Sequence, residues 1–151
     1  MANSKISPAV GQVRCLDHLN LTVKSLDAAL SFYRELFGFV LVETGAPDPY
    51  PWAIIRSGDA MLCLYEHPEL REAPHYPTPP NEHGVRHFGL RVENGPAFCE
   101  LVREKGVELA YGGPVRWPHS TSYYLSDPSG HQIEVVSWDE ETIVFDERPS
   151  D

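Results

Sequence analysis

The stretch "DHLNLTVKSLDAALSFYRELFGF" (17–39) decides the fold, because its pattern returns in the second half of the chain. Apolar and polar residues alternate up to Val23, which predicts a strand, and apolar residues then recur at the spacing of a helix. The stretches "VRHFGLRV" (85–92) and "PAFCELVREKG" (96–106) repeat this order. We therefore expect an internal structural repeat.

Spacing supports the repeat. A histidine and an arginine lie 16 residues apart in each half, as His18 with Arg34 and as His87 with Arg103. Three further strand candidates follow the helical segment of each half, at 39–43, 52–56 and 60–65 and then at 107–111, 122–126 and 131–136. The repeated unit is thus predicted to be a βαβββ module.

Two such modules predict an α+β fold. We assign residues 14–65 to the first module and 85–138 to the second, with tails at 1–13 and 139–151. The segment 66–84 holds five prolines, which disfavour regular structure, and is interpreted as a linker. Because a sheet with a helix on one face needs cover on the other, we expect the two tandem modules to form a curled mixed-sheet half-barrel with its helices on the outer face.

Composition and charge exclude several classes of function. The formal net charge of -10 over 151 residues argues against a nucleic-acid-binding protein and against adsorption to an anionic membrane. The N-terminus has no apolar core of signal-peptide length, and no stretch approaches a membrane span. The three cysteines include no CxxC pair and are odd in number, which favours reduced thiols and a cytoplasmic protein.

The stretch "SDPSGHQIEVV" (126–136) places a carboxylate in a strand that is expected to be buried on both faces. A buried Glu134 needs a cation, a metal ion or strong hydrogen bonds. An ion pair is one possibility, with Arg56, Arg86 or Arg91 as partner. The repeat offers another, because pseudo-twofold symmetry brings four positions together: His18, Cys63, His87 and Glu134.

Two imidazoles and one carboxylate match a facial-triad metal site with open coordination positions. The half-barrel is therefore predicted to surround a metal site. Cys63 is interpreted as a small buried apolar residue near the metal that does not bind it, since thiolate ligation favours a closed, zinc-like site.

Three stretches of the sequence resemble the vicinal oxygen chelate superfamily: residues 17–39, "VRHFGLRV" (85–92) and "DPSGHQIEVV" (127–136). This group includes glyoxalase I, extradiol dioxygenases, fosfomycin resistance transferases, methylmalonyl-CoA epimerase and bleomycin resistance proteins. The resemblance implies paired βαβββ modules around one divalent metal ion, with His18, His87 and Glu134 as ligands. It also implies a homodimer whose sites combine the first module of one chain with the second module of the other.

Motifs separate some activities within the superfamily. Glyoxalase I enzymes carry a fourth ligand, usually Glu, where this chain has Cys63, and the absence of that ligand counts against glyoxalase I activity. "MLCLYEHPE" (61–69) is similar to fosfomycin thiol transferases, but Asn20 stands in place of their threonine, and "GGPVRWPHST" (112–121) lacks their lysine and potassium-binding loop. Bleomycin-type binding proteins generally lack metal ligands, which this chain keeps.

Extradiol dioxygenases resemble this chain in the 2-His-1-Glu set and in a tyrosine ten residues before the Glu, here Tyr124. Their signature also has a histidine before that tyrosine, and His119 is the candidate, although its gap to Tyr124 is shorter than usual. Tyr124 would donate a hydrogen bond to a substrate oxygen, and His119 could serve as acid or base. An aromatic residue at the rim of the site is the other interpretation of Tyr124.

We therefore predict a metal-dependent enzyme that acts on a small, oxygen-bearing substrate able to chelate the metal. An extradiol-dioxygenase-type reaction at Fe2+ is the first choice. A glyoxalase-like lyase or isomerase, or a thiol transferase, at Mn2+, Zn2+ or Ni2+ is the alternative. A metal-free small-molecule binding protein of the bleomycin-resistance type is the alternative from a different class.

Overall fold

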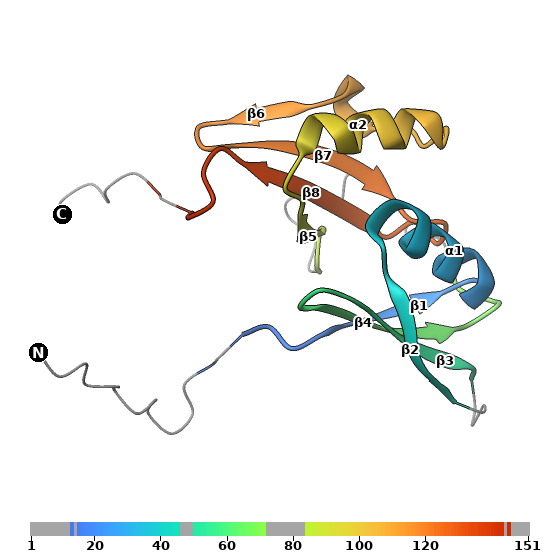
Figure 1. Ribbon diagram of the computed structural model, residues 1–151. Coiled ribbons are helices and arrows are strands. Elements are labelled where there is room, and N and C mark those ends of the chain that lie inside the picture. Colours follow the sequence, from blue (N-terminus) through green and yellow to red (C-terminus); the bar gives the residue numbers. More distant parts are fainter. Residues whose placement is uncertain (1–12, 14, 46–49, 72–83, 144, 146–151) are drawn as a thin grey trace, which may run out of the picture.

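A computed structural model describes residues 13, 15–45, 50–71, 84–143 and 145 (Figure 1). The elements within these ranges are β1 Leu19–Val23, α1 Leu26–Phe37, β2 Val40–Gly45, β3 Trp52–Ser57, β4 Ala60–Glu66, β5 Phe88–Arg91, α2 Gly95–Glu104, the short 3-10 helix η1 Ala110–Gly112, β6 Val115–Trp117, β7 Ser120–Ser126 and β8 Gln132–Trp138. Residues 72–83 of the predicted linker, and 1–12, 144 and 146–151 of the predicted tails, lie outside the described ranges. None of the helices in these ranges is both long and apolar enough to cross a membrane.

The two halves form two four-stranded sheets with the same connections. Their strand orders are β1-β4-β3-β2 and β5-β8-β7-β6. In each sheet the first strand runs parallel to the last, and the remaining neighbours are antiparallel. A parallel first-to-last pair is what a helical crossover between strands produces. The predicted α+β fold built from two βαβββ units is therefore confirmed.

The signals for the start and end of α1 act as the sequence predicts. Ser25 precedes the helix in an extended conformation, and its Oγ accepts a hydrogen bond from the backbone N–H of Ala28 at 3.3 Å. Gly38 ends the helix at a φ of 65°, where the absence of a Cβ avoids a steric penalty. In α2 the cap is Asn94, whose Oδ1 accepts from the N–H of Ala97 at 2.9 Å.

One predicted strand is wrong. Residues 107–111 do not form a strand; the chain turns through η1 and begins the corresponding strand, β6, only at Val115. The reason is the backbone of "YGG", where Tyr111 has a φ of 58°, Gly112 of 75° and Gly113 of 130°. Positive φ angles interrupt an extended chain, and the two glycines permit them at little steric cost. The apolar residues before this turn pack as irregular chain instead.

Both helices belong to one hydrophobic core. Each lies against a face of its own sheet (Figure 1). The rings of Phe37, at the end of α1, and Phe98, in α2, are stacked with centroids 5.6 Å apart. The two helices are therefore in contact with each other, a contact that the sequence pattern did not predict.

The turn between β7 and β8 docks on the first half of the chain. The Tyr33 hydroxyl of α1 donates a hydrogen bond to Asp127 Oδ2 at 2.9 Å, and both residues are buried. Asp127 Oδ1 accepts the backbone N–H groups of Ser129 and His131 at 2.9 and 2.8 Å. Burial, and then the neighbouring Asp127 carboxylate, raise the pKa of Tyr33 far above its usual range, so Tyr33 remains a hydrogen-bond donor.

Two more hydrogen bonds complete this docking. Ser129 Oγ accepts from the N–H of Lys24 at 2.9 Å, and His131 Nε2 lies 2.7 Å from the carbonyl oxygen of Thr22. The carboxylate of Asp127 thus organises a turn that joins the second half of the chain to β1 and α1. The helix side of the molecule is where the two halves meet.

Candidate functional site

His87 and Glu134 meet at the start of the second sheet. His87 lies one residue before β5, and Gly89, two residues further along, is paired with Glu134 of β8. His87 Nε2 lies 2.8 Å from Glu134 Oε2. The Glu134 side chain is only 19% exposed, whereas that of His87 is 41% exposed. The carboxylate is thus held inside the rim while the imidazole stays accessible.

Two hydroxyl groups hold the other oxygen of this carboxylate. Ser122 Oγ donates to Glu134 Oε1 at 2.7 Å, and the Tyr124 hydroxyl donates to the same oxygen at 2.8 Å. Tyr124 and Glu134 are direct partners across β7 and β8. Burial raises the pKa of Tyr124, and its hydrogen bond to Glu134 raises it further, so this phenol stays protonated.

Ser122 is a site residue that the sequence reasoning missed. It is fully buried, and it lies two residues before Tyr124 on β7. Residues two apart on a strand share a face, so the position of Tyr124 already indicated that Ser122 points to the same carboxylate.

A cavity of about 560 Å³ lies over this pair. Its walls come from β7, β8 and the hairpin between β6 and β7, and they are mostly aromatic or apolar: His87, Trp117, Pro118, His119, Ser120, Tyr124, Glu134, Val136, Trp138 and Phe145. The volume lies within the range of pockets that bind small molecules, roughly 300 to 1,000 Å³. The cavity therefore brings together the four residues of the second half that the sequence singled out: His87, His119, Tyr124 and Glu134.

His18 lies apart from these residues. It occupies the position equivalent to His87, one residue before β1 in the first sheet. Its Nδ1 contacts Asp17 Oδ2 at 2.8 Å, and its side chain is 46% exposed. No group of three or more His, Cys, Asp or Glu side chains placed to hold a metal ion occurs among the described residues. A single chain thus joins two of the three predicted ligands and leaves His18 separate.

Cys63 also belongs to the first sheet. It lies on β4 opposite Asn20 of β1, where burial, and to a lesser extent the nearby Asp17 carboxylate, raise the pKa of its thiol. A thiol with a raised pKa is a poor metal ligand, because metals bind the thiolate.

The chemistry and spacing of the His87–Glu134 pair fit one divalent ion. Imidazole nitrogen and carboxylate oxygen bind such ions at about 2.1 Å, so neighbouring ligands on one ion are about 3 Å apart. The 2.8 Å separation of Nε2 and Oε2 agrees with this spacing. The hydroxyls of Ser122 and Tyr124 fix the second carboxylate oxygen, as outer partners of metal ligands commonly do. A complete facial triad needs one more imidazole.

The chain is similar to several known proteins. Lactoylglutathione lyase from Haemophilus influenzae is 27% identical over 79% of this chain and 89% of its own length. Catechol-2,3-dioxygenase from Bacillus subtilis is 30% identical over 81% of this chain, which matches 41% of that protein. The crystal structure of a point mutant of the fosfomycin resistance protein FosX from Listeria monocytogenes, with Mn(II) and 1S,2S-dihydroxypropylphosphonic acid, has a TM-score of 0.66 and 18% identity, over 86% of this chain and 96% of that one.

A family model covers most of the chain. The model describes the Glyoxalase/Bleomycin resistance protein/Dioxygenase superfamily, and it matches residues 15–135. The matched range includes both sheets up to the middle of β8, together with His18, His87 and Glu134. The chain therefore belongs to the Glyoxalase/Bleomycin resistance protein/Dioxygenase superfamily.

Proposed function

We propose that this protein is a metal-dependent enzyme acting on a small oxygenated substrate that chelates the metal, with a dioxygenase-type reaction as the first choice. The observation that carries the proposal is the His87–Glu134 pair, with its 2.8 Å separation, in the wall of an aromatic cavity. The superfamily includes metal-dependent enzymes, and a similar structure holds Mn(II).

The third ligand comes from a second copy of the chain in this proposal. The docked turn at 127–131 and the Phe37–Phe98 stack join the two halves along their helices, and His18 then lies apart from His87 and Glu134. A homodimer in which the partner subunit's His18 reaches the His87–Glu134 pair completes the 2-His-1-carboxylate set. Each dimer would hold two such sites, related by its twofold axis.

The bound metal would polarise the chelating oxygens of the substrate. The residues of this chain have separate roles around it. Tyr124 and Ser122 orient Glu134, and Tyr124 can turn its hydroxyl to a substrate oxygen while remaining protonated. His119 lies in the same cavity wall and can take or give a proton. Trp117 and Trp138 supply flat apolar surfaces that favour a planar substrate.

The aromatic walls support the choice of a dioxygenase-type reaction at Fe2+. A catechol is planar, has two adjacent oxygens that can chelate a metal, and fits beside indole and phenol rings. In extradiol cleavage both atoms of O2 enter the ring-opened product, so no external reductant is needed. The similarity to catechol-2,3-dioxygenase supports the same choice, and that to lactoylglutathione lyase supports the alternative of a lyase at Mn2+, Zn2+ or Ni2+.

The test is a metal analysis followed by an activity screen. Protein purified without chelators is expected to contain close to one divalent metal ion per chain. Fe2+-loaded protein should consume O2 with catechol or 4-methylcatechol, and a yellow ring-opened product should form. Lactoylglutathione lyase activity at Mn2+, Zn2+ or Ni2+, without O2 uptake, would show that the protein is a lyase and not a dioxygenase. Less than a tenth of a metal ion per chain, with no uptake of added Fe2+, Mn2+ or Zn2+, would identify a metal-free binding protein instead.

Replacement of Cys63 by Ala should leave the metal content nearly unchanged, because burial keeps the thiol protonated and the proposed ligand set does not use it. The measurement is metal content per chain by plasma mass spectrometry. Cys99→Ala is the control, since Cys99 is also half-buried and lies on α2, away from the proposed site. Loss of metal in Cys63→Ala but not in Cys99→Ala would show that Cys63 is a metal ligand.

A further inference from the structure

The hairpin of β6 and β7 forms one wall of the cavity. Trp117, Pro118, His119 and Ser120 are consecutive at its tip, and all four line the cavity. Within the hairpin, Trp117 is paired with Ser120, and Ser120 is in turn paired with Trp138 of β8. β6 has only three residues and lies at the edge of the sheet, so few ladder hydrogen bonds hold this wall.

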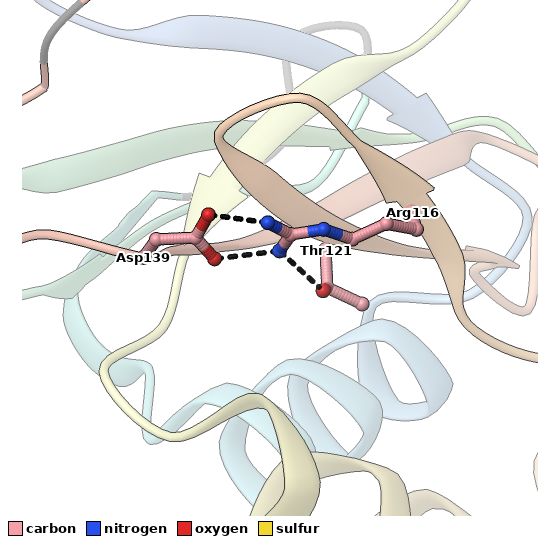
Figure 2. Close-up of polar contacts among 3 residues, drawn as sticks. All are labelled: Arg116, Thr121 and Asp139. Carbon is pink, nitrogen blue, oxygen red and sulfur yellow. Dashed lines mark hydrogen bonds and ion pairs between the residues drawn. The ribbon is translucent and has the colours of Figure 1, made fainter.

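A bidentate ion pair fastens the hairpin to the end of β8 (Figure 2). Arg116 Nη1 and Nη2 donate to Asp139 Oδ1 and Oδ2 at 2.6 and 2.5 Å, and Nη1 also donates to Thr121 Oγ1 at 3.4 Å. The backbone N–H of Asp139 donates to the carbonyl oxygen of His119 at 3.0 Å. One residue, Asp139, thus holds the hairpin both through its side chain at Arg116 and through its backbone at His119.

This pair contributes orientation more than stability. The side chains of Arg116 and Asp139 are 58% and 42% exposed, and exposed ion pairs contribute little to the free energy of unfolding. Two parallel N–H···O bonds between planar groups, however, fix the direction of both side chains. The hydrogen bonds from Arg116 lower the pKa of Asp139, so Asp139 is ionised beside the guanidinium group.

We propose that Arg116 and Asp139 are positioning residues, which hold the hairpin so that His119 and Trp117 keep their places in the cavity wall. The contact acts through the hairpin, since neither residue lines the cavity over His87 and Glu134. Its consequence for catalysis rests on the proposed function, whereas its consequence for the structure of the hairpin does not.

The test uses full-length protein with Asp139→Asn, which keeps the backbone bond to His119 and removes the charge, and Arg116→Lys, which keeps the charge and removes the bidentate geometry. Glu35→Gln is the matched control, because the Glu35–Lys105 pair, at 2.9 Å, is also exposed and joins the two helices instead. The rescue variant exchanges the partners, as Arg116→Asp with Asp139→Arg.

Two measurements need no activity. Hydrogen exchange of the amides of 116–122 should accelerate about tenfold in both single variants, while the midpoint of thermal unfolding moves by only about 2 °C. The ring resonances of His119 in metal-free protein, assigned with His119→Gln, should shift in the same variants. The exchange of partners should restore both signals, and Glu35→Gln should change neither. Unchanged exchange and unchanged His119 resonances in both single variants would overturn the proposal.

The kinetic measurement applies to the substrate found in the activity screen. We expect kcat to fall about tenfold in Asp139→Asn with less than a threefold change in KM, because a displaced His119 affects proton transfer more than binding. If wild-type protein shows no turnover, the proposed function fails, and exchange and resonances still decide the role of the pair. Normal kinetics in a variant whose hairpin exchanges faster would contradict the positioning of His119.

Discussion

A His18→Ala chain and a Glu134→Ala chain, each inactive alone, should regain metal sites and activity when they are unfolded and refolded together. If sites are shared between subunits, one of the two sites in a mixed dimer is complete. The His18→Ala chain supplies its His87 and Glu134, and the Glu134→Ala chain supplies the partner subunit's His18. Random pairing of equal amounts gives mixed dimers half of the time, so about a quarter of the normal sites should return. Metal content and O2 uptake measure the recovery.

The matched control mixes His87→Ala with Glu134→Ala. These two residues supply one site from the same chain, since their side chains are 2.8 Å apart, so no dimer of the two variants contains both. No recovery is expected in this mixture. Absence of recovery in the first mixture as well, or a monomer by light scattering, would place each whole site within one chain and would contradict the proposed dimer.

Asp127→Ala should destabilise the fold by about 3 to 5 kcal/mol, although Asp127 lies outside the proposed active site. The carboxylate is 5% exposed and accepts hydrogen bonds from Tyr33 and from two backbone N–H groups. Its removal leaves the Tyr33 hydroxyl buried without a partner and loosens the turn that joins the halves. Urea unfolding followed by circular dichroism gives the change in free energy of unfolding.

A turn in the first half supplies the control for this prediction. Asp59 lies in the hairpin between β3 and β4, which corresponds to the turn of Asp127, but its side chain is fully exposed. Asp59→Ala should change the free energy of unfolding by less than about 0.5 kcal/mol. Tyr33→Phe, combined with Asp127→Ala in a double-mutant cycle, should show a coupling above about 1 kcal/mol. Additive effects would mean that the buried Tyr33–Asp127 bond does not contribute to stability.

Periodicity and end signals predicted the local structure well. The alternation before Val23 and the helical spacing after Ser25 gave the correct strand and helix, because each follows from which face of a local element is apolar. The resemblance to extradiol dioxygenases singled out Tyr124, ten residues before Glu134, but it did not predict that the two pair directly, which the short turn between antiparallel β7 and β8 brings about. The failure at 107–111 came from backbone angles at Tyr111 and the glycines after it, which the apolar pattern does not encode.

The arrangement of the two halves could not be predicted in the same way. Apolar spacing shows that a helix face is buried but not what covers it, and α1 is covered partly by α2 and by the turn at Asp127. For the same reason the sequence grouped His18 with His87 and Glu134 by symmetry, whereas the packing of one chain separates them. That these three residues bind one metal ion, at a site shared between the two subunits of a dimer, stays a prediction.

The docked turn also has a consequence for how the chain folds as it is synthesised. Its hydrogen bonds join residues that are far apart in the sequence. Tyr33 and Asp127 are 94 positions apart, Lys24 and Ser129 are 105 apart, and Thr22 and His131 are 109 apart. Contacts of such long sequence separation form late, because a large loop must close before they contribute. The first half therefore leaves the ribosome before Asp127 and Phe98, the second-half partners of Tyr33 and Phe37, have been synthesised. Until residue 131 emerges, the nascent chain keeps an apolar helix face uncovered, the kind of surface that chaperones bind.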